Sequence, residues 1–392
     1  MTSTDICFEK PSNLEHVHEL GWMYCRSFSA RQIELQNKML ELYSCKGCII
    51  TCSGMAAIAC VLNTVIDEFV QTEMTGMPRY RLTQTLENVS IAIVVSTEMY
   101  SDTQRLVKHI ASSYNNLSES HKCIRVFEFN QDPNCIAESL QLVADAIKDL
   151  DARVLVFAET VSNPSGFLLD AVAMRRFSQN ISKQKKHPPV VVLDNTWVSH
   201  IGIKDPLSAY NAQLVIVSLS KHYSAGQTIL GAIVGHKKWT HLCHEQTKRS
   251  GMHVDPAACS LVLNTIPLMK FRVRAAHLNA LGVELALQRY IKPDTPQCIN
   301  NIEWCGENEG CTVMLLTVGL GLTDAIEWMK HGIDQKLIAY QTSFGGDNYR
   351  FDTFPVAYTR NATFCRLSIG IDQSPDEIVN EMLLSLACIG FV

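Results

Sequence analysis

The sequence predicts an α/β protein: a large domain built on a mainly parallel β-sheet with helices on both faces, then a smaller C-terminal α+β domain. Apolar runs rich in β-branched residues, such as "VSIAIVVS" (89–96) and "PVVVLDNT" (189–196), alternate with helix-like segments, as parallel strands joined by helices do. After about residue 240 the alternation gives way to long helical segments. The 392 residues are enough for two domains, each with its own core.

The elements of the large domain follow from local patterns in chain order. Residues 31–44 carry apolar positions at helical spacing, and residues 48–70 combine a short strand, a turn at Ser53–Gly54 and a helix. A further helix is expected near 136–149. The remaining apolar runs predict strands within 89–96, 153–160, 189–196 and 212–220.

The C-terminal part has a different pattern. Residues 256–290 predict long helical structure, and 311–320 and 364–371 predict strands of a smaller α+β unit. The polar segments 76–90 and 112–122 are typical of surface insertions. We expect the domain junction inside the long helical run, which divides the chain into an N-terminal arm at 1–40, a large domain at 41–283 and a small domain at 284–392.

The composition is that of an ordinary soluble globular protein. Hydrophobic residues make up 47% and charged residues 19% of the chain, and the net charge is −5 without a long basic run. This charge gives no electrostatic basis for binding nucleic acid or an anionic membrane, and it leaves small polar or anionic metabolites as ligands. No apolar run is expected to reach the roughly 18 residues of a spanning helix, and no signal pattern is seen. The expected location is cytoplasmic.

The fifteen cysteines stand at irregular spacings, which fits reduced thiols better than a disulfide framework. Cys45 and Cys48 form a CxxC pair, with Cys52 four residues further on. Such a pair occurs in redox centres and in zinc sites, but no second CxxC or CxxH motif completes four ligands. Buried structural thiols are therefore favoured, and no metal site is expected.

Polar side chains stand where the predicted strands end. Because the carboxyl ends of adjacent parallel strands share one crevice, these groups are expected to meet there. The set comprises Tyr100 after 89–96, Glu159 and Asn163 in "ETVSNP", Asp194 in "LDNT", and Ser218, Ser220 and Lys221 in "SLSK".

The Ser53–Gly54 turn adds an anion site to this crevice, since free N–H groups at a helix start bind phosphate. A phosphate cradle, an amine, a carboxylate for a ring nitrogen and an aromatic ring are the needs of pyridoxal 5'-phosphate (PLP). Each feature alone has a simpler reading: a lone Asp is more often a helix cap, a lone Lys is most often solvated, and Tyr100 can be packing. Their joint occurrence predicts a PLP site.

The motifs resemble those of the PLP enzymes of cysteine and methionine metabolism, which include cystathionine γ-synthase, cystathionine γ- and β-lyases, methionine γ-lyase and O-acetylhomoserine sulfhydrylases. The resemblance implies a fold-type-I, aminotransferase-like architecture. The matching segments are "YCRSFSAR" (24–31), "SGMAAI" (53–58), "ETVSNP" (159–164), "LDNTW" (193–197), "SLSKHYSAG" (218–226), "RVRAAHLNA" (272–280), "SFGG" (343–346) and "CRLSIGID" (365–372).

The resemblance implies roles for individual residues. Lys221 would form the internal aldimine, Asp194 would pair with the pyridine nitrogen, and Tyr100 would stack on the ring and take part in proton transfer. Arg366 matches the arginine that binds the substrate's α-carboxylate. The further contacts implied are Gly54, Met55, Ser218 and Ser220 to the phosphate, Asn163 to the cofactor, Ser343 near the carboxylate, and Tyr24 and Arg26 to the phosphate of a neighbouring subunit.

The implied activity is that of a C–S lyase or a γ-elimination or γ-replacement enzyme, acting on a small sulfur-containing or O-activated homoserine-type amino acid through the Lys221 aldimine. The implied assembly is a homodimer or homotetramer with active sites shared between subunits. Two alternatives remain open. One is a specialised enzyme that joins a carbon or sulfur nucleophile to a vinylglycine-type intermediate. The other is a non-catalytic scaffold of the same fold, against which stands the survival of all four principal site residues.

Three positions depart from the family's pattern where the substrate is recognised. Met23 and Thr342 stand where cystathionine-specific members are expected to carry glutamates for a distal amine. Asp102 stands where methionine γ-lyase is expected to carry cysteine. Asp102 either meets a cationic substrate tail or caps a helix, and the cap is favoured.

Overall fold

The computed structural model describes residues 29–73, 89–117, 123–293, 299–304, 311–335, 344–347, 349–351, 357–358 and 363–387. Four of the predicted site residues lie outside these ranges, namely Tyr24, Arg26, Thr342 and Ser343. Met23, residues 76–88 of the first predicted insertion and residues 118–122 of the second also lie outside them. Residues 112–116, where the second insertion was predicted, continue the helix α5 (Ser101–Asn116).

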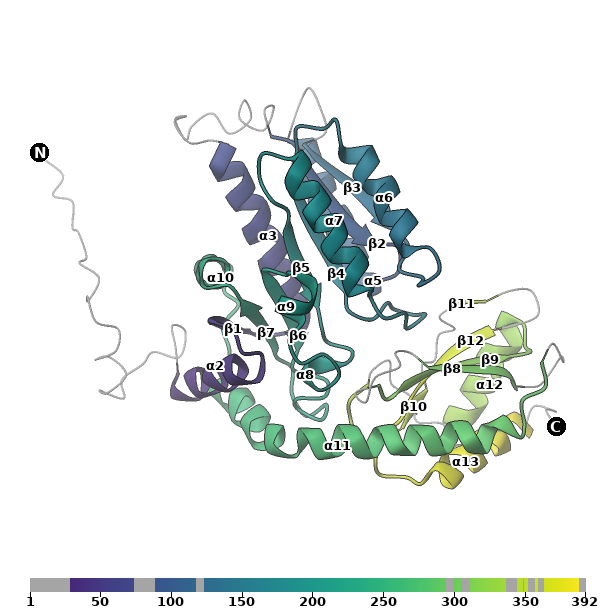
Figure 1. Cartoon of the computed structure of the whole chain (residues 1–392). Helices are drawn as coiled ribbons and strands as arrows, with labels where there is room; N and C mark the ends of the chain where they lie inside the picture. Colours follow the sequence, from purple (N-terminus) through teal and green to yellow (C-terminus); the bar gives the residue numbers. More distant parts are fainter. Residues whose placement is uncertain are drawn as a thin grey trace, which may run out of the picture.

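A seven-stranded sheet forms the centre of the larger part of the molecule (Figure 1). Its spatial order is β1-β7-β6-β5-β4-β2-β3, and β7 runs opposite to its neighbours while the other described pairings from β6 to β3 are parallel. The strands are β1 (Gly47–Thr51), β2 (Ile91–Ser96), β3 (Ile124–Phe129), β4 (Arg153–Glu159), β5 (Val190–Asp194), β6 (Leu214–Ser218) and β7 (Gly231–Gly235).

Helices cover both faces of this sheet because successive residues of its buried strands point to opposite sides. In β4, Val154 and Val156 enter one core and Leu155 and Phe157 the other. The first core is completed by α2 (Ala30–Leu42), α6 (Ile136–Ile147), α7 (Ala171–Gln184) and the start of α11 (Pro256–Gln288). The second is completed by α3 (Gly54–Glu73), α5 (Ser101–Asn116) and α10 (Lys237–Arg249). The short helices α8 (Ser199–Gly202) and α9 (Pro206–Tyr210) lie in the connection from β5 to β6.

A second, smaller sheet lies beyond the long helix α11, in the order β10-β12-β9-β8 with β11 paired to β12 (Figure 1). Its pairings are antiparallel. Its core includes Trp328, Met314 and Leu367, all buried. The elements are β8 (Ile299–Trp304), β9 (Val313–Val318), α12 (Leu322–Asp334), β10 (Arg350–Phe351), β11 (Ala357–Tyr358), β12 (Thr363–Ser368) and α13 (Pro375–Ala387).

Helix α11 joins the two parts by contributing to both cores along its 33 residues. Its buried side chains belong to the large-sheet core up to Val273 and to the small-sheet core from Ala280. The division of the chain at residue 283 stays a prediction.

The predicted fold class is confirmed, since a mostly parallel α/β sheet is followed by a smaller antiparallel sheet with helices. Five strands were not foreseen, namely β3 and β7 of the large sheet and β8, β10 and β11 of the small one. In β3, polar Arg125 and Glu128 interrupt the apolar run at the edge of the sheet. Strand β7 begins and ends with glycine, and Gly231 lies so close to its neighbours that a Cβ there would collide with the carbonyl of Ser53.

The expectation that no segment is long and apolar enough to span a membrane was wrong for α3. Residues Gly54–Thr72 pass that test of length and composition. Leu62, Ile66 and Phe69 of this helix are fully buried against the large sheet. The apolar length of α3 is therefore used in packing the protein's own core.

Candidate active site

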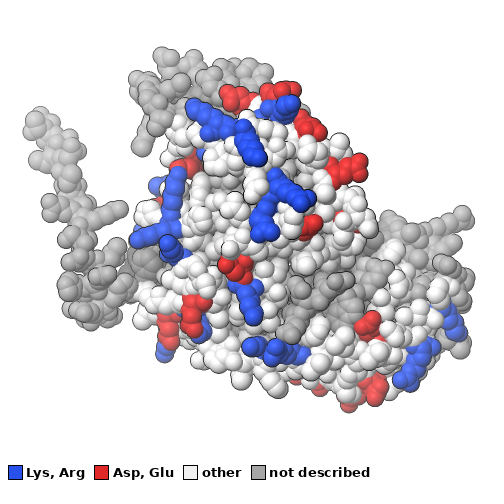
Figure 2. Space-filling model, viewed as in Figure 1, with Lys and Arg blue, Asp and Glu red and all other residues white. Residues whose placement is uncertain are grey.

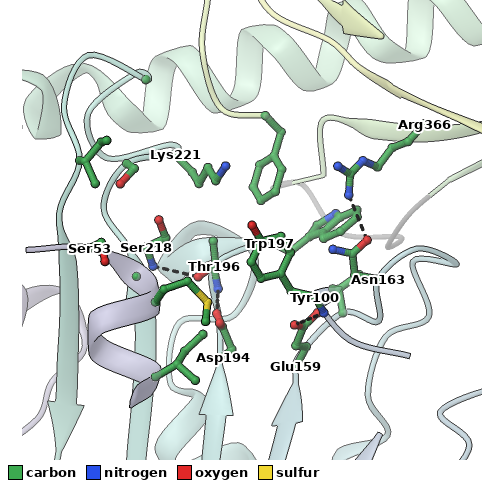
Figure 3. Close-up of a pocket in the computed structure, with 18 of the residues that line it drawn as sticks. Ser53, Tyr100, Glu159, Asn163, Asp194, Thr196, Trp197, Ser218, Lys221 and Arg366 are labelled. Atoms are coloured by element: carbon green, nitrogen blue, oxygen red, sulfur yellow. Dashed lines mark hydrogen bonds between the residues drawn. The ribbon is translucent and has the colours of Figure 1, made fainter. Parts of the chain in front are cut away.

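A cavity of about 460 Å3 opens at the carboxyl ends of β4, β5 and β6, beneath the small sheet (Figure 3). Glu159, Asp194 and Ser218 are the last residues of these three adjacent strands. Because β4 and β5 are paired with Glu159 opposite Asp194, the two carboxylates share the cavity floor. Of the predicted site residues, the cavity is lined by Gly54, Met55, Tyr100, Glu159, Asn163, Asp194, Ser218, Ser220, Lys221 and Arg366.

The predicted anion cradle is formed by the start of α3 and the end of β6. Ser53 caps the helix, since its Oγ accepts a hydrogen bond of 3.0 Å from the N–H of Ala56. A Cβ on Gly54 would lie 2.9 Å from Cβ of Ser218, so a larger residue would fill the space between helix and strand. Free N–H groups at this helix start point to a place for a phosphate. The hydroxyl of Ser220 is instead held by the backbone of Leu230, at 3.1 Å.

Lys221 follows β6 and reaches into the cavity from the side opposite Tyr100 and Arg366 (Figure 3). Its Nζ lies 5.2 Å from the ring centroid of Phe344, a residue that enters from the small-sheet side. Gly345, at a φ of +80°, packs against the backbone of Lys221 and His222. This close approach fixes the position of Phe344 over the lysine, and a side chain at 345 would prevent it.

The pKa values of the two buried carboxylates are both raised. Burial raises the pKa of Asp194 to about 6, opposed by hydrogen bonds from Thr196, whose N–H donates to Oδ1 at 2.8 Å. Burial raises the pKa of Glu159 well above its ordinary value, and the nearby charge of Asp194 raises it further. Burial beside a second carboxylate thus disfavours the charged form of Glu159, while a pKa of about 6 leaves Asp194 mostly charged at neutral pH. Oε1 of Glu159 accepts from the N–H of Tyr100 at 2.7 Å.

Tyr100 stands at the N-terminal end of α5, with its side chain partly exposed at the cavity wall. Its phenol pKa is raised, first by burial and then by the hydrogen bond and charge of Asp102, while the charge of Arg366 lowers it. The expectation that Asp102 caps this helix was wrong: Tyr100 occupies the cap position, and Asp102 lies in the first turn. Asp102 pairs with Arg105 at 3.0 Å and does not line the cavity.

Arg366 extends from β12 across the cavity to the large-sheet side (Figure 3). Its Nη1 donates to Oδ1 of Asn163 at 3.0 Å, and its guanidinium carbon lies 5.4 Å from the ring centroid of Trp197. The guanidinium is thus held between an amide and an aromatic face.

Three groups of the cavity wall were not predicted as site residues. Trp197 and Phe344 stack at 5.2 Å between centroids, so they form an aromatic wall between Lys221 and Arg366. Both directly follow motif residues, at "LDNTW" and "SFGG", and this adjacency was the available signal. The third is Arg350 of β10, which belongs to none of the motifs identified in the sequence.

No group of three or more His, Cys, Asp or Glu side chains in the described ranges is arranged to hold a metal ion. The cysteines of the CxxC segment are free thiols, with Cys48 buried, Cys45 half-buried and Cys52 exposed. The arrangement thus lends no support to a metal role for this segment.

The donor set fits PLP. The helix start at Ser53–Gly54 suits a phosphate, and the amine of Lys221 lines the same cavity. Asp194 is a buried carboxylate whose charge costs free energy until a cation lies beside it, and a protonated ring nitrogen would supply that cation.

Comparisons with known proteins agree with this geometry. The family model described as "Cys/Met metabolism PLP-dependent enzyme" matches residues 1–293. A cystathionine gamma synthase from Xanthomonas oryzae pv. oryzae has a similar structure, at a TM-score of 0.71 and 20% identity over 99% of this chain and 91% of that one. A methionine gamma lyase from Micromonospora echinospora gives a TM-score of 0.66 at 19% identity, over 93% and 88% of the two chains. The sequence has no match among curated proteins.

Proposed function

The chain belongs to the family of Cys/Met metabolism PLP-dependent enzymes, and we propose that it is a C–S lyase or a γ-elimination or γ-replacement enzyme. Its substrate would be a small sulfur-containing or O-activated homoserine-type amino acid. The observation that carries the proposal is the meeting of Lys221, Asp194, the start of α3 and Arg366 in one cavity.

Several residues of the cavity would hold the cofactor. Lys221 would bond to its aldehyde carbon, Asp194 would accept the ring N–H, and the α3 start with Ser218 would bind the phosphate. When bound, PLP supplies an electron sink for the pair of electrons left when the substrate's Cα loses its proton. Tyr24 and Arg26 are proposed to contact the phosphate of a neighbouring subunit.

The protein's own groups would orient the substrate and move its protons. Arg366 would bind the α-carboxylate with its forked guanidinium, in the orientation that Asn163 and Trp197 already impose. Ser343 and Thr342 are proposed to line the same region. The amine of Lys221, once free, would accept the proton from Cα, and for γ chemistry also from Cβ. Tyr100 would donate a proton to the departing sulfur or oxygen.

The visible absorption spectrum tests the proposal. Protein supplied with PLP is expected to develop a visible absorption band that a Lys221→Ala protein lacks. A band that responds to methionine, cystathionine, cysteine or O-acetylhomoserine would identify the substrate branch. Protein that stays colourless with PLP would contradict the proposal and favour the scaffold alternative. Product analysis with and without an added nucleophile separates replacement from elimination.

The proposed assembly is a homodimer or homotetramer, and the outer face of α11 supports it. This face carries two rows of large apolar side chains that are 41% to 70% exposed. Within each row the residues are seven apart: Leu261 and Leu268 form one row, and Phe271, Leu278 and Leu285 form the other. They lie opposite the side that packs on the cores, where a helix facing water would carry polar residues. Such a long apolar stripe supports the proposed contact with another copy of the chain.

Light scattering tests the assembly. A Phe271→Glu, Leu278→Glu protein is expected to be smaller in solution than the wild type, because two charges would enter the apolar contact. Leu142→Glu is the matched control, since Leu142 of α6 is 64% exposed but lies outside the stripe. An unchanged mass for the α11 variant would rule out this surface. The proposed location is the cytoplasm, in keeping with ten free cysteines in the described ranges.

Charge offers no competing ligand class. Basic and acidic side chains are both spread over the face shown in Figure 2, and the net charge is −5. A nucleic-acid partner would require a basic surface, and none is proposed.

A further inference from the structure

The cavity contains a second arginine that the proposed reaction does not use. Arg350, at the start of β10, lines the same cavity as Lys221 and Arg366. Its guanidinium packs on Gly346, where any Cβ would collide with it, and lies 3.5 Å from the place of a Cβ on Gly226. Gly226 has a φ of +77° in the loop that follows Lys221. Two positions without side chains therefore make room for this guanidinium at the cavity.

The strand register places the two arginines on one face of the small sheet. Arg350 of β10 is paired with Ser368 of β12, and Arg366 stands two residues before Ser368. Residues two apart on a strand point to the same side, so Arg350 and Arg366 are diagonal neighbours. Such neighbours have Cα atoms roughly 7–8 Å apart. The sheet thus presents two forked cations to one cavity.

The charges of the cavity leave Arg350 available for an anion. Arg366 faces Asn163 and would take the α-carboxylate, and the start of α3 would take the phosphate. Burial lowers the pKa of Arg350, and among the described residues Asp347 is the carboxylate whose charge opposes that shift. The same carboxylate is shared with Arg272, whose Nη1 lies 3.7 Å from Oδ1 of Asp347.

We propose that Arg350 is a second anion-binding residue of the cavity, and that the substrate is an amino acid whose side chain carries an anionic group beyond Cγ. This inference rests on the proposed function, because it takes Arg366 as the carboxylate site. An anion at each end of the substrate would meet one arginine of the diagonal pair. A carboxylate, sulfonate or phosphate ester at the distal end has the required chemistry.

Three six-carbon L-amino acids test the proposal without turnover, since none has a leaving group on Cγ. They are 2-aminoadipate with an anionic end, norleucine with a neutral end and lysine with a cationic end. Dissociation constants are read from the visible spectrum of the PLP-loaded protein. We expect 2-aminoadipate to bind at least about tenfold more tightly than norleucine, and lysine to bind most weakly.

Substitutions at Arg350 test whether this residue causes the preference for 2-aminoadipate over norleucine. Arg350→Gln is expected to reduce the preference for 2-aminoadipate over norleucine to below about threefold, while the dissociation constant of norleucine changes little. Arg350→Lys should retain part of the preference, because it keeps the charge without the fork. Arg125→Gln, which alters an exposed arginine on β3, should leave the preference unchanged.

Equal binding of the two ligands by the wild type, or a preference that survives Arg350→Gln, would overturn the proposal. A loss of PLP affinity in Arg350→Gln with the preference intact would assign Arg350 to the cofactor phosphate instead. Thermal shifts of the protein without PLP provide a separate reading. If PLP does not bind, the proposed function fails. The anion subsite is then tested by the melting temperature: it exists if 2-aminoadipate raises the melting temperature more than norleucine does, and if Arg350→Gln removes that difference.

Discussion

Arg366 and Asn163 lie 203 residues apart in the chain, yet Nη1 of the arginine donates to Oδ1 of the asparagine at 3.0 Å. Arg366 belongs to the small sheet, and Asn163 follows β4 of the large one. The hydrogen bond therefore sets the direction of the guanidinium by joining the two sheets across the cavity.

Asn163→Ala tests this positioning. We expect the KM for the amino-acid substrate to rise about tenfold with a smaller change in kcat, because the guanidinium loses its fixed orientation but keeps its charge. Arg366→Ala should raise KM far more. Steady-state kinetics on both variants give the two KM values. An equal rise in KM in the two variants would show that Asn163 does more than orient the arginine.

Gly54→Ala tests the anion cradle. The new methyl group would lie 2.9 Å from Cβ of Ser218, so it should narrow the space between α3 and β6 and lower the affinity for PLP by at least about tenfold. Fluorescence titration with PLP gives the dissociation constant. Gly251→Ala is the control, because φ at Gly251 is +68° but nothing lies near its Cβ. That variant should lose stability and keep its PLP affinity. Similar PLP affinities in the two variants would contradict a cradle at Gly54.

Asp194 predicts a pH dependence of stability in protein freed of PLP. Its folded pKa of about 6 is above the ordinary 3.8, so its contribution is fully present below about pH 4 and is lost as pH rises through 6. The loss is on the order of 3 kcal/mol. Urea unfolding at pH 4, 5, 6 and 7.5 should show the stability of wild type falling relative to Asp194→Asn as pH rises. A constant difference between the two proteins would refute a raised pKa.

Phe344 predicts a contrast between two substitutions. Its ring is 7% exposed and contacts Trp197, His222 and the amine of Lys221. Phe344→Ala should destabilise the protein by about 3 kcal/mol and raise KM, because it opens the aromatic wall. Phe344→Leu fills most of the volume and should cost less than about 1.5 kcal/mol. Urea unfolding measures the first effect and initial rates the second. The idea fails if both variants match wild type in KM.

The sequence by itself determined five of the seven strands of the large sheet, β1, β2, β4, β5 and β6, and the types of residue at their ends. Buried parallel strands are continuous apolar runs, and the first polar residue after such a run marks its carboxyl end, as at Asp194. The same local signal located Ser53–Gly54 before α3 and Lys221 after β6. These features depend on neighbours in the chain, so they can be read without the fold.

Only the tertiary structure decided which of these groups act together and in which state. The pairing of β4 with β5 buries Glu159 beside Asp194, and burial together with the charge of Asp194 raises the pKa of Glu159. The register of β10 on β12 brings Arg350 to the face that carries Arg366. Protonation depends on burial and on charges distant in sequence, and a shared face depends on register. Both arise from long-range packing, which a local pattern of residues does not contain.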